Sequence, residues 1–252
     1  MIPGTVAVLW GHRQRRRVTA LTLRLTGMPR RRDERPAPPR LPTDLPTEPT
    51  SHLIAGGYVN GCTIRGDFSN NHLEGLVLED AHVVGCSFIA TDLRGVRMVD
   101  VFVEGSDLSG ADLEEAELTR VTFTNSRMSS ASVPRSRMRD ISFEEVRLDD
   151  VNLRRSDGER VVFDGVNLQR GDLHAARLSS ARFFGCNLRG VDVSEADLRG
   201  ARFHGSDLSE LKGGEYLRDI MIDSVQVLPL AMQVFAGLNI RIEDDREMDC
   251  PE

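Results

Sequence analysis

Several residue types are scarce in this chain of 252 residues, and each scarcity removes a class of protein from consideration. Aromatic residues make up 5% of the sequence, so a core has to be built from aliphatic side chains and a few phenylalanines. The four cysteines lack the paired spacing of a zinc site. No apolar run approaches the ~20 residues that a membrane-spanning helix needs. These absences argue against a metal-stabilised module and against a membrane protein.

Charge is unevenly distributed along the chain, whose net charge is −7. Residues 1–50 carry +6, residues 51–210 carry −8 and residues 211–252 carry −5. The acidic central part argues against direct binding of nucleic acid by that part. An arginine cluster within 13–17 leaves two alternatives open, a basic arm for nucleic acid or anionic lipid and a floppy tail that precedes a second candidate first residue, Met28.

What the chain has in abundance is a five-residue repeat, which runs in one register from Ser51 to Glu210. Read as 32 pentapeptides, the segment has an apolar third residue in 30 of them, with Thr63 and Gly158 as the exceptions. The first slot is small or β-branched equally often. Since a period of five fits neither a helix nor a plain strand, the repeat itself predicts the architecture.

A second period, of 20 residues, indicates how many sides each turn of the chain has. Twenty residues are four pentapeptides, so we expect four-sided coils that stack at the sheet spacing of about 4.8 Å, roughly eight of them over residues 51–210. Phenylalanines recur at this interval and are expected to form a structural core ladder: Phe123, Phe143, Phe163, Phe183 and Phe203. Parallel crossovers are almost always right-handed, so the fold class predicted is all-β, a right-handed quadrilateral parallel β-helix.

The second slot of the repeat is often Asp or Asn, which suggests how the corners form. Short Asx side chains accept hydrogen bonds from nearby backbone N–H groups at turns. We therefore expect a turn after each of the following residues: Asp67, Asp92, Asp107, Asp112, Asn152, Asn167, Asp172, Asn187, Asp192, Asp197 and Asp207.

The best-formed repeats resemble the pentapeptide-repeat family, whose motif is A(D/N)LxG-like. Residues 196–200 read ADLRG, residues 186–190 read CNLRG and residues 111–113 read ADL. The resemblance covers about 160 of the 252 residues. It implies the same right-handed quadrilateral β-helix and gives no indication of a cofactor.

Residues 1–50 do not continue the repeat, and we expect a disordered basic and proline-rich tail there. Positions 36–49 read PAPPRLPTDLPTEP, and proline lacks the N–H group that a helix or a sheet requires. The apolar stretches beside the arginine cluster are too short for a signal peptide. With cysteines expected to be buried thiols, the sequence favours a cytoplasmic protein.

Residues 211–240 are expected to close the repeat with a C-terminal cap and dimerisation helix, and residues 241–252 to form an acidic tail. Asp223 and Gln226 have the spacing of a capping box, and the helix is expected from about Ser224 to Ala236. Pro229 is expected to kink it near its start.

The apolar residues of this helix form two stripes, so both faces need cover. We expect one stripe, Val225, Leu228, Met232 and Phe235, to close the last coil and the other to meet a second copy of the chain. The candidate dimerisation residues are Val227, Leu230, Val234 and Leu238. The ending IMIDSVQVLPLAMQVFAGLNI is similar to the C-terminal module of pentapeptide-repeat proteins that protect DNA gyrase from quinolones, and that resemblance implies a homodimer joined through these helices.

Catalysis is not indicated by any motif in the chain. There is no phosphate-binding glycine loop and no nucleophile elbow. Adjacent acids such as Glu144 and Glu145 are expected on a convex surface, whereas catalysis needs a concave site that excludes water. We predict no catalytic, cofactor-binding or metal-binding residues and no enzyme activity.

The outward slots are what remains to carry a function. The side that begins at Ser51 is the most negative, and its candidate partner-binding residues are Asp92, Asp112, Glu114 and Glu115. A negative rod about as wide as duplex DNA suggests a DNA mimic that binds a type II topoisomerase such as DNA gyrase. The alternative is an interaction scaffold with an unknown protein partner.

Overall fold

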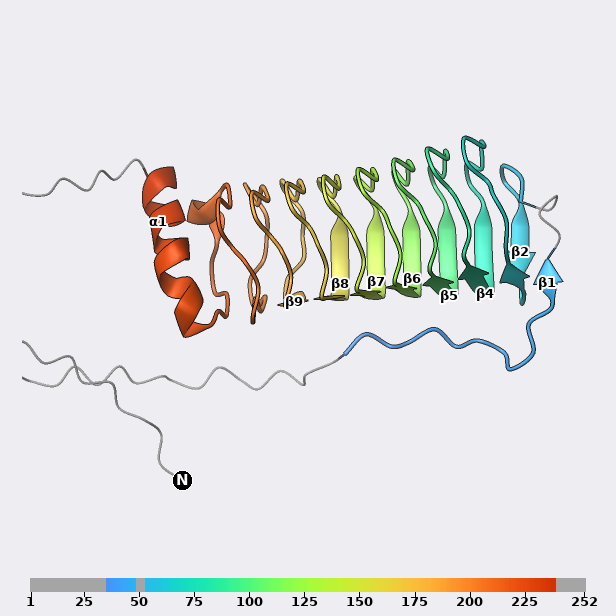
Figure 1. Ribbon diagram of the computed structural model, residues 1–252, viewed down its shortest axis with the longest axis horizontal. Helices are drawn as coiled ribbons and strands as arrows, with labels where there is room; N and C mark the ends of the chain where they lie inside the picture. Colours follow the sequence, from blue (N-terminus) through green and yellow to red (C-terminus); the bar gives the residue numbers. More distant parts are fainter. Residues whose placement is uncertain (1–34, 49–52, 239–252) are drawn as a thin grey trace, which may run out of the picture. The chain divides into compact units, whose positions relative to one another are not determined.

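The structure, a computed structural model, describes residues 35–48 and 53–238. The basic tail expected before residue 35 and the acidic tail expected over 241–252 lie outside the described residues. The strands form one sheet with parallel pairing in the order β1-β3-β4-β5-β6-β7-β8-β9, and β2 pairs with β4 off this path (Figure 1). The strands are β1 (Thr47–Glu48), β2 (Tyr58–Asn60), β3 (Thr63–Ile64), β4 (Val77–Val84), β5 (Arg97–Glu104), β6 (Glu117–Thr124), β7 (Arg137–Glu144), β8 (Asp157–Asp164) and β9 (Arg182–Phe184). Two 3-10 helices, η2 (Gly214–Tyr216) and η3 (Ser224–Gln226), precede the C-terminal helix α1 (Val227–Gly237).

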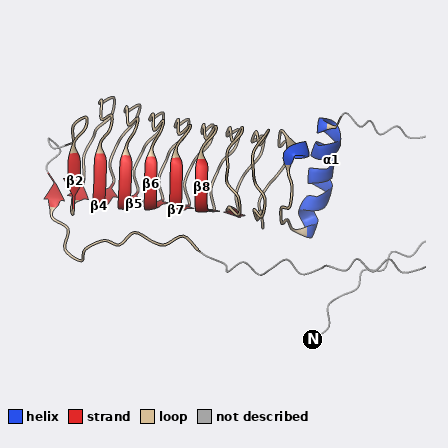
Figure 2. Ribbon diagram, turned by 180° about the vertical axis from the view of Figure 1, so that it is seen from behind, coloured by secondary structure: helices blue, strands red, loops and turns tan. Residues whose placement is uncertain are grey.

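Successive strands from β4 onward are offset by 20 residues, one full coil. Val77 lies opposite Arg97 and Arg97 opposite Glu117, and single bridges such as that between Asp92 and Asp112 keep the same offset on other sides. Figure 2 shows the strands stacked along the coils and α1 at one end. The predicted fold class, a right-handed quadrilateral parallel β-helix with a C-terminal helix, is confirmed.

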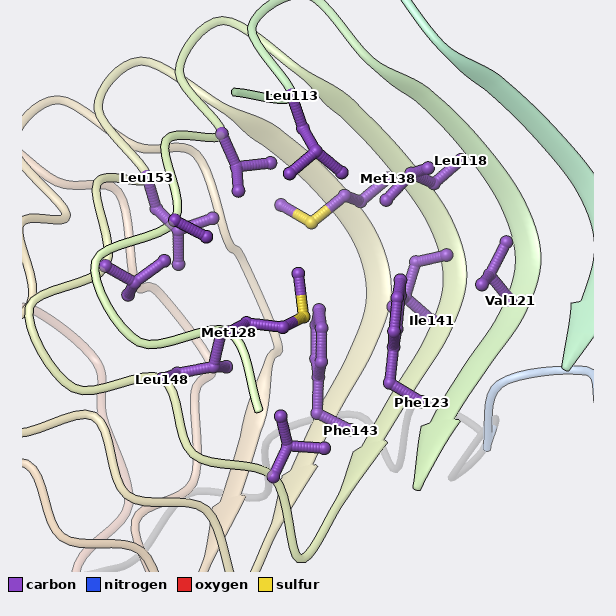
Figure 3. Packing of buried hydrophobic residues seen from close by; sticks show 14 of the residues in the cluster. Leu113, Leu118, Val121, Phe123, Met128, Met138, Ile141, Phe143, Leu148 and Leu153 are labelled. Atoms are coloured by element: carbon purple, nitrogen blue, oxygen red, sulfur yellow. The ribbon is translucent and has the colours of Figure 1, made fainter. Parts of the chain in front are cut away.

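The five phenylalanines of the ladder stack in one column inside the coils. Neighbouring ring centroids are 4.7–5.1 Å apart with interplanar angles of 2–9°, which is the spacing of stacked parallel strands. Phe163 is completely buried. Figure 3 shows Phe123 and Phe143 face to face beside the sulfurs and aliphatic chains of Met128 and Met138. The core is therefore a set of columns of like side chains, one column for each inward slot.

The Asx turns predicted from the second slots are confirmed at all of their positions. In each, the Oδ1 atom accepts the backbone N–H two residues ahead, as Asp112 does from Glu114 at 3.0 Å and Asn152 from Arg154 at 3.1 Å. Each of the remaining Asp and Asn residues of the set accepts the same bond. Ser132 occupies a second slot that lacks Asp or Asn. The residue two positions later is Pro134, which has no backbone N–H to donate, so no Asx acceptor is needed there.

The first described coil departs from the register expected from Ser51. Val59 and Ile64 are 4% and 1% exposed and lie opposite Leu78 and Val83, so their offset to the next coil is 19 residues. Tyr58, which the repeat assigns to an inward slot, is 61% exposed. The expectation of a single register is therefore wrong for this coil, and Val59 and Ile64 belong to the core although the repeat assigns them to outward slots.

The offset of 19 instead of 20 arises at the corner that contains Gly66, which is one residue shorter than the equivalent corner of the next coil. Asp67 already pairs with Ser87 at the full offset of 20, so the corner after Ile64 is one residue shorter than those of later coils. Gly66 has φ of 140°, a backbone conformation that side chains with a Cβ rarely adopt. Only glycine accommodates the shortened corner without strain.

Gly158 occupies an inward third slot that elsewhere holds a large side chain. A Cβ atom built there would lie 2.4 Å from Cδ2 of Leu178, the residue one coil further along the same column. The volume missing at Gly158 is thus occupied by a leucine of the neighbouring coil, and the column stays packed.

The segment 35–48 is extended and lies alongside the coils, which differs from the disordered linker expected over 36–49 (Figure 1). The backbone N–H groups of Ala37 and Arg40 donate to the carboxylates of Asp140 and Asp100. β1 continues this segment and pairs in parallel with β3. Composition predicted no structure because the acceptors of the Ala37 and Arg40 N–H groups are side chains 103 and 60 residues away. We refer to residues 35–48 as the strap.

The last coil is closed by two side chains that replace the backbone of a further coil. Nε2 of Gln226 donates to the carbonyl oxygens of Phe203 and Ser206, both at 2.6 Å, and Gln226 is 5% exposed. The Asp223 carboxylate accepts the N–H of Gly205 at 2.6 Å. Asp223 and Gln226 also form the predicted capping box. Pro229 lies in the first turn of α1, where its missing N–H leaves no helical hydrogen bond unmade.

Candidate partner-binding surface

The concave features of the described surface are shallow. One of them is an open depression of about 320 Å³ over β6, β7 and β8. Its charged residues neutralise one another, since Arg137 bonds to Glu117 and Arg139 to Glu159, each at 3.0 Å. No group of three His, Cys, Asp or Glu residues that could hold a metal ion is found in 35–48 or 53–238. None of the helices described there is long and apolar enough to cross a membrane.

The candidate residues Asp92 and Asp112 occupy the same corner in adjacent coils and face each other across one bridge. Burial and the neighbouring Asp92 charge raise the pKa of Asp112. Asp92 accepts bonds from Nε and Nη2 of Arg94 at 2.9 and 2.7 Å. Both carboxylates are half-buried and take part in the turn, so only part of each charge is offered outward.

Glu114 and Glu115, the other two candidates, share one cation. Arg135, in the next coil, forms ion pairs with both, and its Nε lies 3.3 Å from Oε1 of Glu115. Glu115 is 66% exposed and Glu114 29% exposed. The structure therefore brings the four candidate residues onto adjacent coils of one side, and it also supplies arginines that offset much of their charge.

The candidate dimerisation residues on α1 do not share one environment. Leu230 is 9% exposed and Val234 lies against Gly214, so these two face the solenoid, whereas Val227 and Leu238 are each 54% exposed. The side chains that point away from the solenoid are those of the stripe expected to close the last coil: Val225, Leu228, Met232 and Phe235, which are 79%, 72%, 50% and 39% exposed. The expected orientation is therefore wrong for Leu230 and Val234, which turn inward, whereas Val227 and Leu238 are exposed together with the other stripe. A helix with two apolar faces does not indicate which one turns inward.

One charged ladder was not singled out from the sequence. The fifth-slot residues Asp100, Arg120, Asp140 and Arg160 succeed one another at 20-residue intervals. Asp100 and Asp140 are 7% exposed, more buried than any of the four candidate acids. The sequence does contain a signal for this ladder, since Asp and Arg alternate at intervals of 20 residues. The alternation is visible when charges are followed along one slot from coil to coil, and it is lost when charges are summed over a whole side.

The cysteines play a structural part in the described coils. Cys86 and Cys186 are buried in first slots, and burial raises the pKa of each thiol to about 11. Thiols with such pKa values are protonated at neutral pH and are poor nucleophiles.

Comparison with known proteins identifies the family. A model described as pentapeptide repeat region matches residues 136–212, and one described as pentapeptide repeats (8 copies) matches residues 72–110 and 104–140, so together they span residues 72–212. The chain belongs to the pentapeptide-repeat family. No curated protein sequence matches it at a significant level.

Solved structures of low sequence identity are similar to parts of the chain. HetL, a pentapeptide repeat protein involved in heterocyst differentiation regulation in the cyanobacterium Nostoc sp. strain PCC 7120, is 20% identical, with 66% of this chain and 81% of HetL covered and a TM-score of 0.43. Full-length QnrB1, a plasmid-mediated fluoroquinolone resistance protein, is 16% identical, with 71% and 99% covered and a TM-score of 0.32. Rfr23 from the cyanobacterium Cyanothece 51142 is 18% identical, with 67% and 90% covered and a TM-score of 0.21.

Proposed function

We propose that this chain is a non-enzymatic protein that acts by binding a protein partner through the outside of its solenoid. The observation that carries the proposal is that inward and outward slots of the repeat hold different kinds of side chain. Inward slots fill the core, and outward slots present charged side chains on a convex surface, where the open depression over β6, β7 and β8 is lined by mutually paired charges. Such a surface suits recognition of a large partner better than conversion of a small molecule.

The specific partner that we propose is a type II topoisomerase such as DNA gyrase, bound in the cytoplasm in place of DNA. The acidic side with Asp92, Asp112, Glu114 and Glu115 supports this, as does the likeness of the C-terminal sequence to gyrase-protecting members of the family. The charge density limits the imitation. The net −8 of residues 51–210, spread over coils about 4.8 Å apart, amounts to one net negative charge per ~5 Å, against one per ~1.7 Å in duplex DNA.

The second candidate is an interaction scaffold for a different protein, and the ion pairs favour it. Arg94 and Arg135 each contact acidic residues of the most negative side. Exposed pairs of this kind contribute little to stability, and they lower the negative potential that a DNA-binding saddle would attract. A scaffold needs local complementarity to its partner and not a strong overall field.

A gyrase supercoiling assay, run with and without a quinolone across protein concentration, separates the two candidates. A DNA mimic inhibits supercoiling or protects the enzyme at micromolar protein. Reversal of Asp112, Glu114 and Glu115 to Arg is expected to weaken that effect at least tenfold. Glu144→Arg with Glu145→Arg is the matched control, since these residues occupy the same fourth and fifth slots on another side. Absence of any effect of the unmodified protein would leave the scaffold as the better description.

We also propose that the chain forms a homodimer through α1. The exposed stripe of Val225, Leu228, Met232 and Phe235 supports an interface on the face opposite Leu230. An apolar helix face of this kind is normally covered in a soluble protein. A second copy would offer the same stripe and bury both at once, in an isologous two-fold contact.

A further inference from the structure

The ladder of Asp100, Arg120, Asp140 and Arg160 repeats one arrangement every two coils. Nε and Nη2 of Arg120 donate to Oδ1 and Oδ2 of Asp100 at 2.7 and 2.5 Å. Arg160 binds Asp140 with the same atoms at 2.5 and 2.9 Å. Each arginine thus holds the aspartate of the preceding coil in a bidentate grip, which fixes the direction of the remaining carboxylate lone pairs.

The remaining acceptor capacity of each aspartate is used by the strap. Oδ1 of Asp140 accepts the backbone N–H of Ala37 at 3.1 Å, and Oδ1 of Asp100 accepts that of Arg40 at 3.0 Å. The two contacts are equivalent, because in each the oxygen that binds Nε of the arginine also binds the strap. Two equivalent bonds in register indicate a periodic match between strap and solenoid.

The match follows from the dimensions of the two structures. A polyproline II segment advances about 3.1 Å per residue and has three residues per turn, so residues three apart face the same way about 9 Å from each other. Two coils of a parallel β-helix span about 9.6 Å. Ala37 and Arg40 are three residues apart, and Asp140 and Asp100 are two coils apart.

The proline pattern of the strap leaves N–H groups where the ladder needs them. Pro36, Pro38 and Pro39 lack the donor and favour the extended backbone, while Ala37 and Arg40 keep it. Pro36 and Pro39, again three residues apart, are half-buried, whereas Pro38 is exposed. One edge of the strap therefore rests on the solenoid, a second donates to it and the third faces solvent.

We propose that the Asp100–Arg120–Asp140–Arg160 ladder is a binding site for a polyproline II peptide that presents two backbone N–H groups three residues apart, and that residues 36–40 of this chain fill it. The site selects its ligand by the spacing of main-chain donors along a proline-rich segment. It lies on another track than Asp92, Asp112, Glu114 and Glu115, so it is separate from the surface proposed for the topoisomerase.

Amide hydrogen exchange on the full-length protein tests occupancy of the site. The amides of Ala37 and Arg40 are expected to exchange at least tenfold more slowly than in a synthetic peptide of residues 35–46. Ala37→Pro removes one donor and keeps the polyproline II backbone, so the amide of Arg40 should lose most of its protection. Pro38→Ala is the matched control, because it removes a proline at an exposed position and keeps both donors.

Binding in trans tests the ligand class. In the full chain with Ala37→Pro and Arg40→Pro, the strap lacks both donors and the ladder is intact. A fluorescein-labelled peptide of residues 35–46 should bind this variant saturably and at least tenfold more tightly than it binds the unmodified protein, whose site is filled. The same peptide with proline at both donor positions should not bind. Asp100→Asn with Asp140→Asn, added to the variant, should weaken binding while leaving the coils folded by circular dichroism.

Three results would overturn the proposal. The first is peptide-like exchange of the Ala37 and Arg40 amides in the unmodified protein. The second is a loss of protection in Pro38→Ala equal to that in Ala37→Pro. The third is trans binding that is indifferent to the two donors of the peptide.

Discussion

At the scale of single residues, each phenylalanine of the ladder is held by like neighbours in the coils above and below. Phe163 lies 5.1 Å from Phe143 and 4.7 Å from Phe183, and it is completely buried. Phe163→Ala is expected to lower the free energy of unfolding by about 3–5 kcal/mol, through lost transfer energy and the cavity left behind. Phe184→Ala, on the outer face of β9, should cost much less. Equal losses in urea unfolding would contradict the stacked core.

The Asx turns allow a second test with an internal control. Asn152→Ala removes the acceptor of the Arg154 N–H and is expected to cost about 1 kcal/mol of unfolding free energy. Ser132→Ala changes the equivalent slot one coil earlier, where Pro134 has no N–H, and should change the free energy of unfolding by less than about 0.5 kcal/mol. Thermal unfolding of the two variants measures the difference, and a Ser132 variant as unstable as the Asn152 variant would count against the assignment.

The acid dependence of the strap follows from Asp100 and Asp140. The bidentate arginine lowers the pKa of each carboxyl, burial opposes it, and the strap N–H lowers it further. The charged groups that face them are Arg40, Arg120 and Arg160. Since the folded pKa lies below the unfolded value of about 3.9, the stabilisation is complete above pH ~4 and is lost only as the pH falls through the lower folded value. Exchange protection of the strap that disappears between pH 7 and 5 would contradict this.

Local chemistry explains which residue-level predictions succeed. An Asx turn depends on one side chain and a backbone group two residues away, so the sequence predicted each one. The register of the first coil was predicted wrongly because Tyr58, an aromatic residue, stands in the slot expected to point inward. The corner that contains Gly66 is one residue shorter than the others, which shifts the register. A shortened corner leaves no trace in a periodic pattern until the partners of the next coil are known.

At the scale of elements, the two apolar faces of α1 allow the proposed dimer to be tested. Leu228→Asp with Met232→Asp places charges on the exposed stripe and is expected to convert a dimer into a soluble monomer that stays folded and whose unfolding temperature no longer depends on protein concentration. Leu230→Asp charges the face toward the solenoid and should instead destabilise the cap, because it buries an unpaired carboxylate. Light scattering and thermal unfolding separate the two effects. A monomeric unmodified protein would show that the stripe has another use.

The strap marks the limit of what element-level reading can predict. Its composition resembles a disordered linker, and nothing within it indicates a partner. The carboxylates that bind it lie 60 and 103 residues away, and their direction depends on arginines one coil further on. Which face of α1 turns inward was hidden for the same reason, since both stripes are apolar and only their burial in the fold distinguishes them: Leu230 is buried and Val234 contacts Gly214.

At the scale of the whole molecule, the outward charges govern how the rod meets a partner. Binding through the acidic side should weaken as salt rises, because exposed charges more than about 10 Å apart are screened at 0.1 M ionic strength. The slope should be shallower than for DNA itself, since Arg94 and Arg135 already offset part of the charge. Titration of the partner between 50 and 300 mM salt measures it. A salt-independent affinity would point to apolar contacts instead.

The strap also has a consequence for how such a protein can change in length. A solenoid of equivalent coils can usually gain or lose one by duplication or deletion, because each coil contacts only its neighbours. Here three residues of strap span two coils, so a coil inserted between Asp100 and Asp140 would separate them by about 14 Å, which three extended residues cannot bridge. The strap, a segment outside the repeat, therefore fixes the number of coils between Asp100 and Asp140. Coils can be added or removed after Arg160 without disturbing these two contacts.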